Sequence, residues 1–132
     1  MDKNILIMCT GNSCRSIIGE ALINKEFNNI KAYSCGVKPS GTVNPHAKKV
    51  LQFHDAWENN YHSKHLDEVI EIDFDLVVTV CDNAKETCPM FPKHTKTIHV
   101  GFVDPDGKGF SAFEETYMLI KDKLLTKVKE QI

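Results

Sequence analysis

The sequence predicts a single α/β domain built on a doubly wound, parallel, four-stranded sheet with helices on both faces. Short apolar runs typical of buried strands alternate with segments whose apolar residues keep helical spacing. The 132 residues suit one domain, and no repeat, linker or low-complexity tract divides residues 1–132. With 42% hydrophobic and 26% charged residues, the composition is that of an ordinary globular protein.

In the first half of the chain, strands are expected over residues 4–8 and 30–35, because each is a short apolar run that ends in turn-forming residues. Between them, residues 16–27 carry apolar side chains at helical spacing. A second helix is expected after the following loop, since its apolar residues recur at steps of three and four. These residues are Ala47, Val50, Leu51 and His54.

In the second half, residues 74–80 give the strongest strand signal, because they are rich in β-branched side chains. A short helix is expected over 63–70 and a fourth strand over 97–102. The last helix is expected to open with Ser111 and Glu114 as a capping box. One face of that helix should pack on the sheet through Phe113, Tyr117, Ile120, Leu124 and Val128.

Charge and hydropathy argue against a nucleic acid or a membrane as partner. The net charge is −2 and the basic residues are spread along the chain. No apolar run approaches the ~20 residues of a membrane span, and no basic leader precedes the first strand. We therefore expect a cytoplasmic, monomeric protein, whose cysteines serve catalysis, metal binding or packing.

The five cysteines, at positions 9, 14, 35, 81 and 88, contain no Cys-x-x-Cys pair. The six histidines do not lie at zinc-finger distances from them. His62 and His65 lie three residues apart, but two ligands make a weak metal site. No metal and no cofactor are therefore expected. Cys9 and Cys81 each follow a predicted buried strand, which places both at the edge of a parallel sheet where ligands bind.

Residues 9–16, Cys-Thr-Gly-Asn-Ser-Cys-Arg-Ser, join the end of a strand to the start of a helix. Backbone amides in such a loop can form an anion nest, to which the helix N-terminus adds positive potential. Arg15 offers a planar fork that matches two oxygens of a tetrahedral oxyanion. The same field stabilises the nucleophilic thiolate of Cys9, to which Ser16 can donate a hydrogen bond. The amides that would line the nest belong to Thr10, Gly11, Asn12, Ser13, Cys14 and Arg15.

Residues 9–16, together with Asp104-Pro105, resemble the signature of the low-molecular-weight protein tyrosine phosphatases. The whole chain resembles more closely the thioredoxin-coupled arsenate reductases, which are built on that phosphatase fold. The most specific match is Cys81 followed by Cys88-Pro89 after a strand, because the phosphatases do not require it. Further matches are Glu20, Tyr33-Ser34 with Gly36, Val43-Asn44-Pro45 with Ala47, His62-Ser63, residues 75–79 and Gly101-Phe102.

The resemblance implies reduction of arsenate to arsenite, which serves arsenic detoxification. Cys9 would be the nucleophile, Arg15 and the loop amides the oxyanion clamp, and Asp104 the general acid. Cys81 would attack second and Cys88 third, which leaves a disulfide between these two for thioredoxin to reduce. Some family members bind potassium through residues that match Asn12, Glu20 and Ser34 and an Asp. His65 stands at the position of that Asp, so no potassium site is expected here.

Other interpretations stay open. The enzyme alternative is a phosphotyrosine phosphatase, which Cys81 and Cys88 disfavour because ester hydrolysis uses neither. A redox-sensing or oxyanion-binding module is disfavoured by Asp104, since a sensor needs no leaving-group acid, although Asp104 can also be a plain turn residue. For Cys14, packing beneath the loop is favoured over a redox role, and Cys35 is expected in the core.

The segment 82–90 carries a geometric prediction. Asp82 can cap a short helix that runs to Cys88 and is stopped by Pro89. A helical rise of ~1.5 Å per residue would separate the Cα atoms of Cys81 and Cys88 by about 10 Å. A disulfide needs these atoms within roughly 7 Å, so the segment is expected to unwind when the disulfide forms.

Overall fold

The computed structural model describes residues 2–82 and 90–132. In this part of the chain the predicted four-stranded parallel sheet is present, with strand order β2-β1-β3-β4. The strands are β1 (Lys3–Cys9), β2 (Ile30–Gly36), β3 (Leu76–Thr79) and β4 (Thr97–His99). Because β1 lies between two neighbours and is covered on both faces, its residues from Ile5 to Met8 have no exposed surface.

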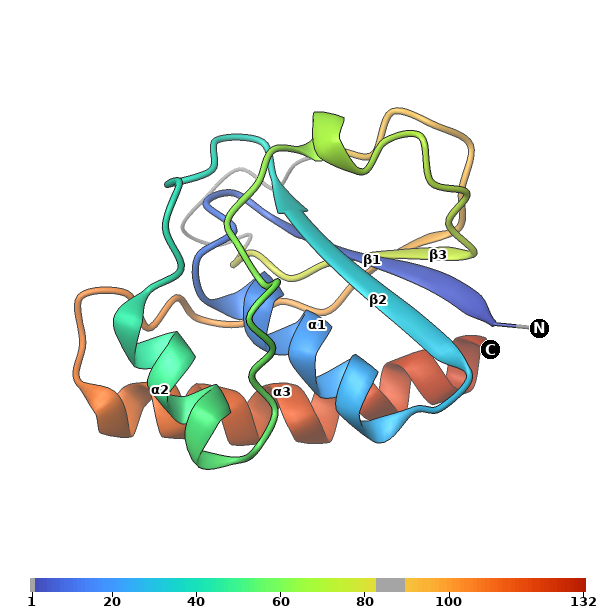
Figure 1. Cartoon of the computed structure of the whole chain (residues 1–132). Coiled ribbons are helices and arrows are strands. Elements are labelled where there is room, and N and C mark those ends of the chain that lie inside the picture. Colours follow the sequence, from blue (N-terminus) through green and yellow to red (C-terminus); the bar gives the residue numbers. More distant parts are fainter. Residues whose placement is uncertain (1, 83–89) are drawn as a thin grey trace.

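The described residues form three α-helices, α1 (Arg15–Glu26), α2 (Pro45–Phe53) and α3 (Phe110–Gln131), and one 3₁₀ turn, η1 (Leu66–Glu68). Figure 1 shows the α-helices below the sheet and η1 above it. Side chains of β1 alternate between the two sides: Ile5 and Ile7 pack in the cluster formed with the α-helices. Leu6 and Met8 pack in the second cluster, with η1 and Phe74. Both faces are covered, as predicted.

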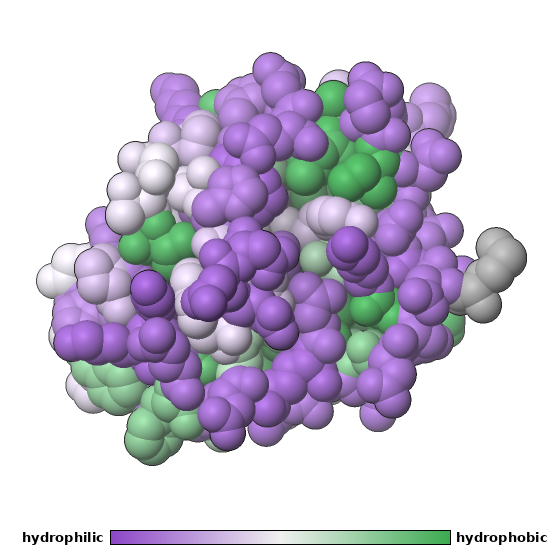
Figure 2. Space-filling model, in the orientation of Figure 1, coloured by the Kyte–Doolittle hydropathy of each residue, from purple (hydrophilic) through white to green (hydrophobic). Residues whose placement is uncertain are grey.

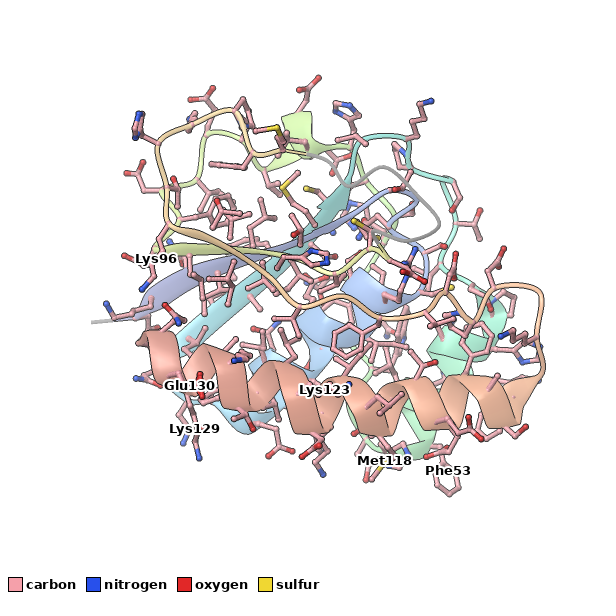
Figure 3. The ribbon with its side chains drawn as sticks, turned by 180° about the vertical axis from the view of Figure 1, so that it is seen from behind. Phe53, Lys96, Met118, Lys123, Lys129 and Glu130 are labelled. Atoms are coloured by element: carbon pink, nitrogen blue, oxygen red, sulfur yellow. The ribbon has the colours of Figure 1, made fainter. Side chains whose placement is uncertain are left out.

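Helix α3 confirms the predicted packing face, because Phe113, Tyr117, Ile120, Leu124 and Val128 are all buried. Its outer face is polar, and in Figure 3 Lys123, Lys129 and Glu130 project from it. Met118 also projects outward, in the same region as Phe53 of α2, and the two are 51% and 73% exposed. On the face drawn in Figure 2, hydrophilic residues predominate and apolar residues form separate small areas. No helix in the described ranges is long and apolar enough to cross a membrane.

Three predicted elements differ from the structure. The capping box of α3 is wrong: the helix begins at Phe110, so Ser111 lies inside it, and the cap residue Gly109 makes no side-chain hydrogen bond. Only η1 forms within the short helix expected over 63–70. The fourth strand ends at His99 rather than at residue 102.

The chain beyond β4 nevertheless follows β3. The amide of Val100 donates to the Thr79 carbonyl at 2.9 Å, and that of Phe102 donates to Val80 at 3.1 Å. Between these two residues, Gly101 lies so close to the chain after β3 that a Cβ on it would be 3.0 Å from the carbonyl oxygen of Cys81. Residues 100–102 are thereby fixed beside the carboxyl end of the sheet, and they lead directly to Asp104.

Two hydrogen bonds connect α1 to β2, one of the two outermost strands of the sheet. The side chain of Asn24 on α1 accepts a hydrogen bond from the amide of Ala32 at 2.8 Å and donates to the Ala32 carbonyl at 3.2 Å. Nearer the carboxyl end of β2, the amide of Gly36 donates to the Lys64 carbonyl at 3.0 Å. These contacts fix α1, β2 and the chain around Lys64 relative to one another, behind the loop that joins β1 to α1.

Candidate active site

The loop between β1 and α1 turns its carbonyl groups outward. Three of these groups accept hydrogen bonds from amides in the segment that follows β2. The pairs, donor first, are Lys38 to Thr10 at 3.0 Å, Ser40 to Gly11 at 3.0 Å and Asn44 to Ser13 at 2.9 Å. In a planar trans peptide the N–H points opposite to the C=O, so the intervening amides face the centre of the loop. This arrangement has the geometry expected of the predicted anion nest.

Cys9 ends β1, and its thiol lies at the centre of the loop, 2% exposed. Its sulfur is 2.9 Å from the hydroxyl oxygen of Ser16 and accepts the amide hydrogen of Asn12 at 3.2 Å. Helix α1 starts at Arg15 without a side-chain cap, so its first-turn amides add positive potential near the sulfur. The sulfur that would act as the nucleophile therefore lies among hydrogen-bonding groups at the start of a helix.

Asn12 organises the loop from inside. It is fully buried and adopts a left-handed backbone conformation, with φ 48°. Its side-chain amide donates to the Ser16 hydroxyl at 2.7 Å, and its carbonyl oxygen accepts the Lys64 amide at 2.8 Å. Because the Ser16 oxygen accepts from Asn12, its hydroxyl hydrogen is available for donation to the Cys9 sulfur. This geometry is compatible with the predicted role of Ser16 as a hydrogen-bond donor to the Cys9 sulfur.

The Arg15 guanidinium connects the loop to the chain that follows β4. It is 4% exposed, donates to the Phe102 carbonyl at 3.1 Å and lies 3.5 Å from a carboxylate oxygen of Asp104. Asp104 is 48% exposed and also accepts the amide of Asp106 at 3.0 Å. The carboxyl group therefore caps a turn and, through Arg15, stands beside the oxyanion loop, where a proton donor to a leaving group is needed.

Cys81 lies two residues beyond β3, fully buried. Strands β1 and β3 are adjacent, with Met8 opposite Thr79, so the chains that lead to Cys9 and Cys81 run side by side. Cys81 is disulfide-bonded, whereas Cys9 is a free thiol. Cys88 lies outside the described residues, as does most of the helix predicted over 82–90. The pairing of Cys81 with Cys88 and the unwinding of that helix therefore stay predictions.

Cys14 and Cys35 are buried free thiols. Burial raises the pKa of each from 9.0 to about 12, so both are neutral near pH 7. Cys14 packs in the cluster shared with the α-helices, and Cys35 packs in the cluster on the other face. These positions favour the packing interpretation of Cys14 and confirm that Cys35 belongs to the core.

Behind the loop, Ser34 donates a hydrogen bond to the Glu20 carboxylate at 2.6 Å. The Lys64 ammonium lies 3.9 Å from the same carboxylate oxygen. Burial raises the pKa of Glu20, and the charge of Lys64 and the bond from Ser34 oppose this shift. Lys64 could not be singled out beforehand, because it stands in a polar stretch and its partner lies on another element. Among residues 2–82 and 90–132, no group of three or more His, Cys, Asp or Glu side chains is arranged to hold a metal ion.

The two histidines considered as a ligand pair have separate partners. His62 lies 3.0 Å from a carboxylate oxygen of Glu68 and 2.9 Å from the Asn60 carbonyl, and these two contacts raise its pKa. His65 accepts the amide of Asp67 at 3.0 Å. Both ring nitrogens of His62 and the Nδ1 atom of His65 are thus hydrogen-bonded within the chain around η1 and do not point toward a shared ligand.

Comparison with known proteins adds to this geometry. Residues 4–132 match the family described as low molecular weight phosphotyrosine protein phosphatase. Arsenate reductase 2 of Staphylococcus saprophyticus is 38% identical over 132 residues, which cover 97% of this chain and 95% of that protein. An arsenate reductase of Bacillus cereus strain G9842 is 42% identical over 114 residues, 85% of this chain and 84% of that protein. The crystal structure of an arsenate reductase from Archaeoglobus fulgidus has a TM-score of 0.85 and 28% identity, with 95% of this chain and 98% of that chain covered.

Proposed function

The chain belongs to the low molecular weight phosphotyrosine protein phosphatase family, and on that premise we propose that it is an enzyme that reduces arsenate to arsenite. The observation that carries the proposal is the placement of Cys9 and Cys81 at the ends of two adjacent parallel strands. Oxyanion capture needs the first thiol alone, whereas a transfer of two electrons needs a second thiol beside it. The curated relatives named above carry the same activity in their names.

In the first step, arsenate would bind to the loop amides and to Arg15, as a tetrahedral oxyanion does in such a nest. The Cys9 thiolate would attack the arsenic atom and form a sulfur–arsenic bond. One hydroxyl group of the arsenate would leave as water after it takes a proton from Asp104. The product is a covalent thiol–arsenate adduct in which arsenic is still in the +5 state.

In the second step, the Cys81 thiolate would attack the sulfur of Cys9. The sulfur–arsenic bond breaks and its electron pair stays on arsenic, so arsenite leaves in the +3 state and a Cys9–Cys81 disulfide forms. Cys88 would then attack the sulfur of Cys81 and release Cys9 as a thiolate. The resulting Cys81–Cys88 disulfide would be reduced by thioredoxin, whose dithiol supplies the two electrons.

Hydrolysis of phosphomonoesters is the second candidate, because the loop, Arg15 and Asp104 are the groups which that reaction needs. A phosphatase has no use for Cys81 at the end of the neighbouring strand, and for this reason we place it second.

The decisive experiment measures arsenite formed from arsenate by the purified protein with thioredoxin, thioredoxin reductase and NADPH. We expect one NADPH to be oxidised for each arsenite released, since each turnover transfers two electrons. An aryl phosphate assayed in parallel should be hydrolysed slowly. Fast aryl phosphate hydrolysis without arsenite formation would identify the chain as a phosphatase instead.

A further inference from the structure

Lys64 is a buried lysine that the proposed chemistry does not use. Its side chain is 7% exposed, and the ammonium lies 3.9 Å from Glu20 Oε1 and donates to the His62 carbonyl at 3.0 Å. Lysine is almost never buried without a partner, because removing its charge from water costs several kcal/mol that only good pairing offsets. The pair therefore indicates a specific need for a positive charge at this place.

The groups around the Lys64 ammonium are oxygen atoms. Glu20 contributes a buried carboxylate, Ser34 a hydroxyl at 2.6 Å from it, and residue 62 a backbone carbonyl. Carboxylate, hydroxyl and carbonyl oxygens are the groups that bind hard cations in proteins. In this chain the positive charge beside these oxygens is the ammonium of Lys64.

The main chain of Lys64 reaches the nucleophile through Asn12. The Lys64 amide donates to the Asn12 side chain at 2.8 Å, and the Lys64 carbonyl accepts the amide of Gly36 at 3.0 Å. Asn12 in turn orients the Ser16 hydroxyl and donates its own amide to the Cys9 sulfur at 3.2 Å. The ammonium on Glu20 thus anchors the segment that holds Asn12 in place.

A cavity of about 300 Å³ gives access to the pair from outside. Glu20 and Lys64 line it together with the exposed Lys31, which lies over the ring of Tyr33 at 5.3 Å. A small ion from solution can therefore reach Glu20 once the Lys64 side chain is removed.

We propose that the Lys64 ammonium is a built-in cation, a positioning residue that neutralises Glu20 and holds the oxyanion loop in shape through Asn12. The protein then needs no dissociable cation behind this loop. The activity readout of this inference rests on the proposed arsenate reduction, whereas its stability readout does not.

The test removes the Lys64 ammonium and offers a potassium ion from solution in its place. Lys64→Ala is assayed in roughly 100 mM choline chloride and in KCl of the same ionic strength, so that screening is equal in both. In choline chloride we expect kcat/KM for arsenate to fall about tenfold, because an unpaired buried carboxylate disturbs the loop. KCl should recover most of the loss and raise the Tm of the variant. Wild-type protein should show neither effect of KCl.

Two further variants control the charge argument. Lys31→Ala removes an exposed lysine from the same cavity, so its activity and Tm should not depend on KCl. Glu20→Gln combined with Lys64→Met removes both charges, so this double variant should also ignore KCl and have a higher Tm than Lys64→Ala in choline chloride.

Two results would overturn the inference: full activity of Lys64→Ala in choline chloride, or a loss of activity and Tm that KCl does not reverse. If Lys64→Ala fails to fold in both salts, the double variant decides. A folded double variant supports neutralisation of Glu20 as the role of Lys64, and an unfolded one overturns it. Wild-type protein that makes no arsenite contradicts the proposed function alone, because the Tm comparison still tests the role of Lys64.

Discussion

Cys9 combines three properties at one residue: a free thiol, two hydrogen-bond partners of its sulfur, and a place at the centre of a loop of inward-facing amides. Arg15, at the start of α1, supplies the cationic side chain of the same motif. Neither Ser16 nor Asn12 can replace a missing sulfur, and the loop amides alone cannot reproduce the two-point contact of a guanidinium with an oxyanion.

Cys9→Ser is therefore expected to abolish arsenate reduction and aryl phosphate hydrolysis together, and Arg15→Ala to reduce both at least ~100-fold by removing a charge-assisted clamp. Arsenite formation and aryl phosphate release are measured on each variant, with circular dichroism to establish folding. Lys38→Ala is the control, because Lys38 contributes only its backbone amide to the loop. Substantial reduction of arsenate by Cys9→Ser would show that another residue is the nucleophile.

Single residues also mark the limit of prediction from sequence. The loop and Arg15 could be predicted because they lie in one short motif, whereas the role of Asp104 followed only from the resemblance to a known family and stays a prediction. Lys64 could not be predicted, since whether a lysine is buried depends on a carboxylate brought to it by folding. The carbonyl of Phe102, which accepts from Arg15, is equally invisible because every residue carries one.

Among the elements, β2 supports the oxyanion loop from one side. Its last residue, Gly36, passes so close to the loop that a Cβ there would lie 2.3 Å from the Thr10 carbonyl oxygen. Such a contact cannot be relieved without a backbone shift.

Gly36→Ala should therefore destabilise the protein by roughly 1–3 kcal/mol and lower arsenate turnover, because the loop must move. Urea unfolding and arsenite formation measure the two effects. Gly109→Ala is the matched control, since a Cβ at Gly109 meets nothing within 4 Å. Equal behaviour of the two variants would mean that the loop tolerates displacement.

The adjacent strands β1 and β3 deliver Cys9 and Cys81 to the same region, but only arsenate reduction uses both. We expect Cys81→Ser and Cys88→Ser to block arsenate turnover and to leave slow hydrolysis of an aryl phosphate, which needs only the loop, Asp104 and water. Both reactions are followed on each folded variant. Equal loss of both activities would show that the loop is not an independent phosphoryl site.

Elements with a strong hydrophobic period were predictable to within two or three residues. The strands β1 and β2, the helix α1 and the buried face of α3 follow from local patterns alone. The end of β4 was not predictable, because Val100 and Phe102 keep hydrogen bonds to the chain after β3 without forming a regular strand. The start of α3 was mispredicted because Gly109 is its cap and Ser111 lies inside the helix.

For the whole molecule, buried acidic protons make stability depend on pH in the alkaline range. Burial raises the pKa of Cys14 and Cys35 from 9.0, and that of Tyr61 from 10.0, to about 12. A raised pKa in the folded state means that the unfolded chain releases the proton first. This contribution to stability is complete below about pH 9 and is lost as the pH rises through about 12.

Each thiol above about pH 9, and Tyr61 above about pH 10, should lower the free energy of unfolding by up to ~1.4 kcal/mol per pH unit. Urea midpoints measured from pH 8 to 11 test this, and Tyr61→Phe should flatten the decline above pH 10, because it removes one of the three groups. An unchanged slope in Tyr61→Phe would contradict the assignment for Tyr61.

The contact between Asn24 and Ala32 has a consequence for how copies of the protein behave at high concentration. Ala32 lies on an outermost strand, where an unpaired amide and carbonyl could form hydrogen bonds with a strand of a second molecule and so extend the sheet. The Asn24 side chain supplies both partners from within the chain and blocks this route. Asn24→Leu keeps the size of the side chain and removes its hydrogen bonds, so the variant should self-associate as its concentration rises. Light scattering of dilution series should detect this, with Asn59→Leu, at an exposed site outside the sheet, staying monodisperse.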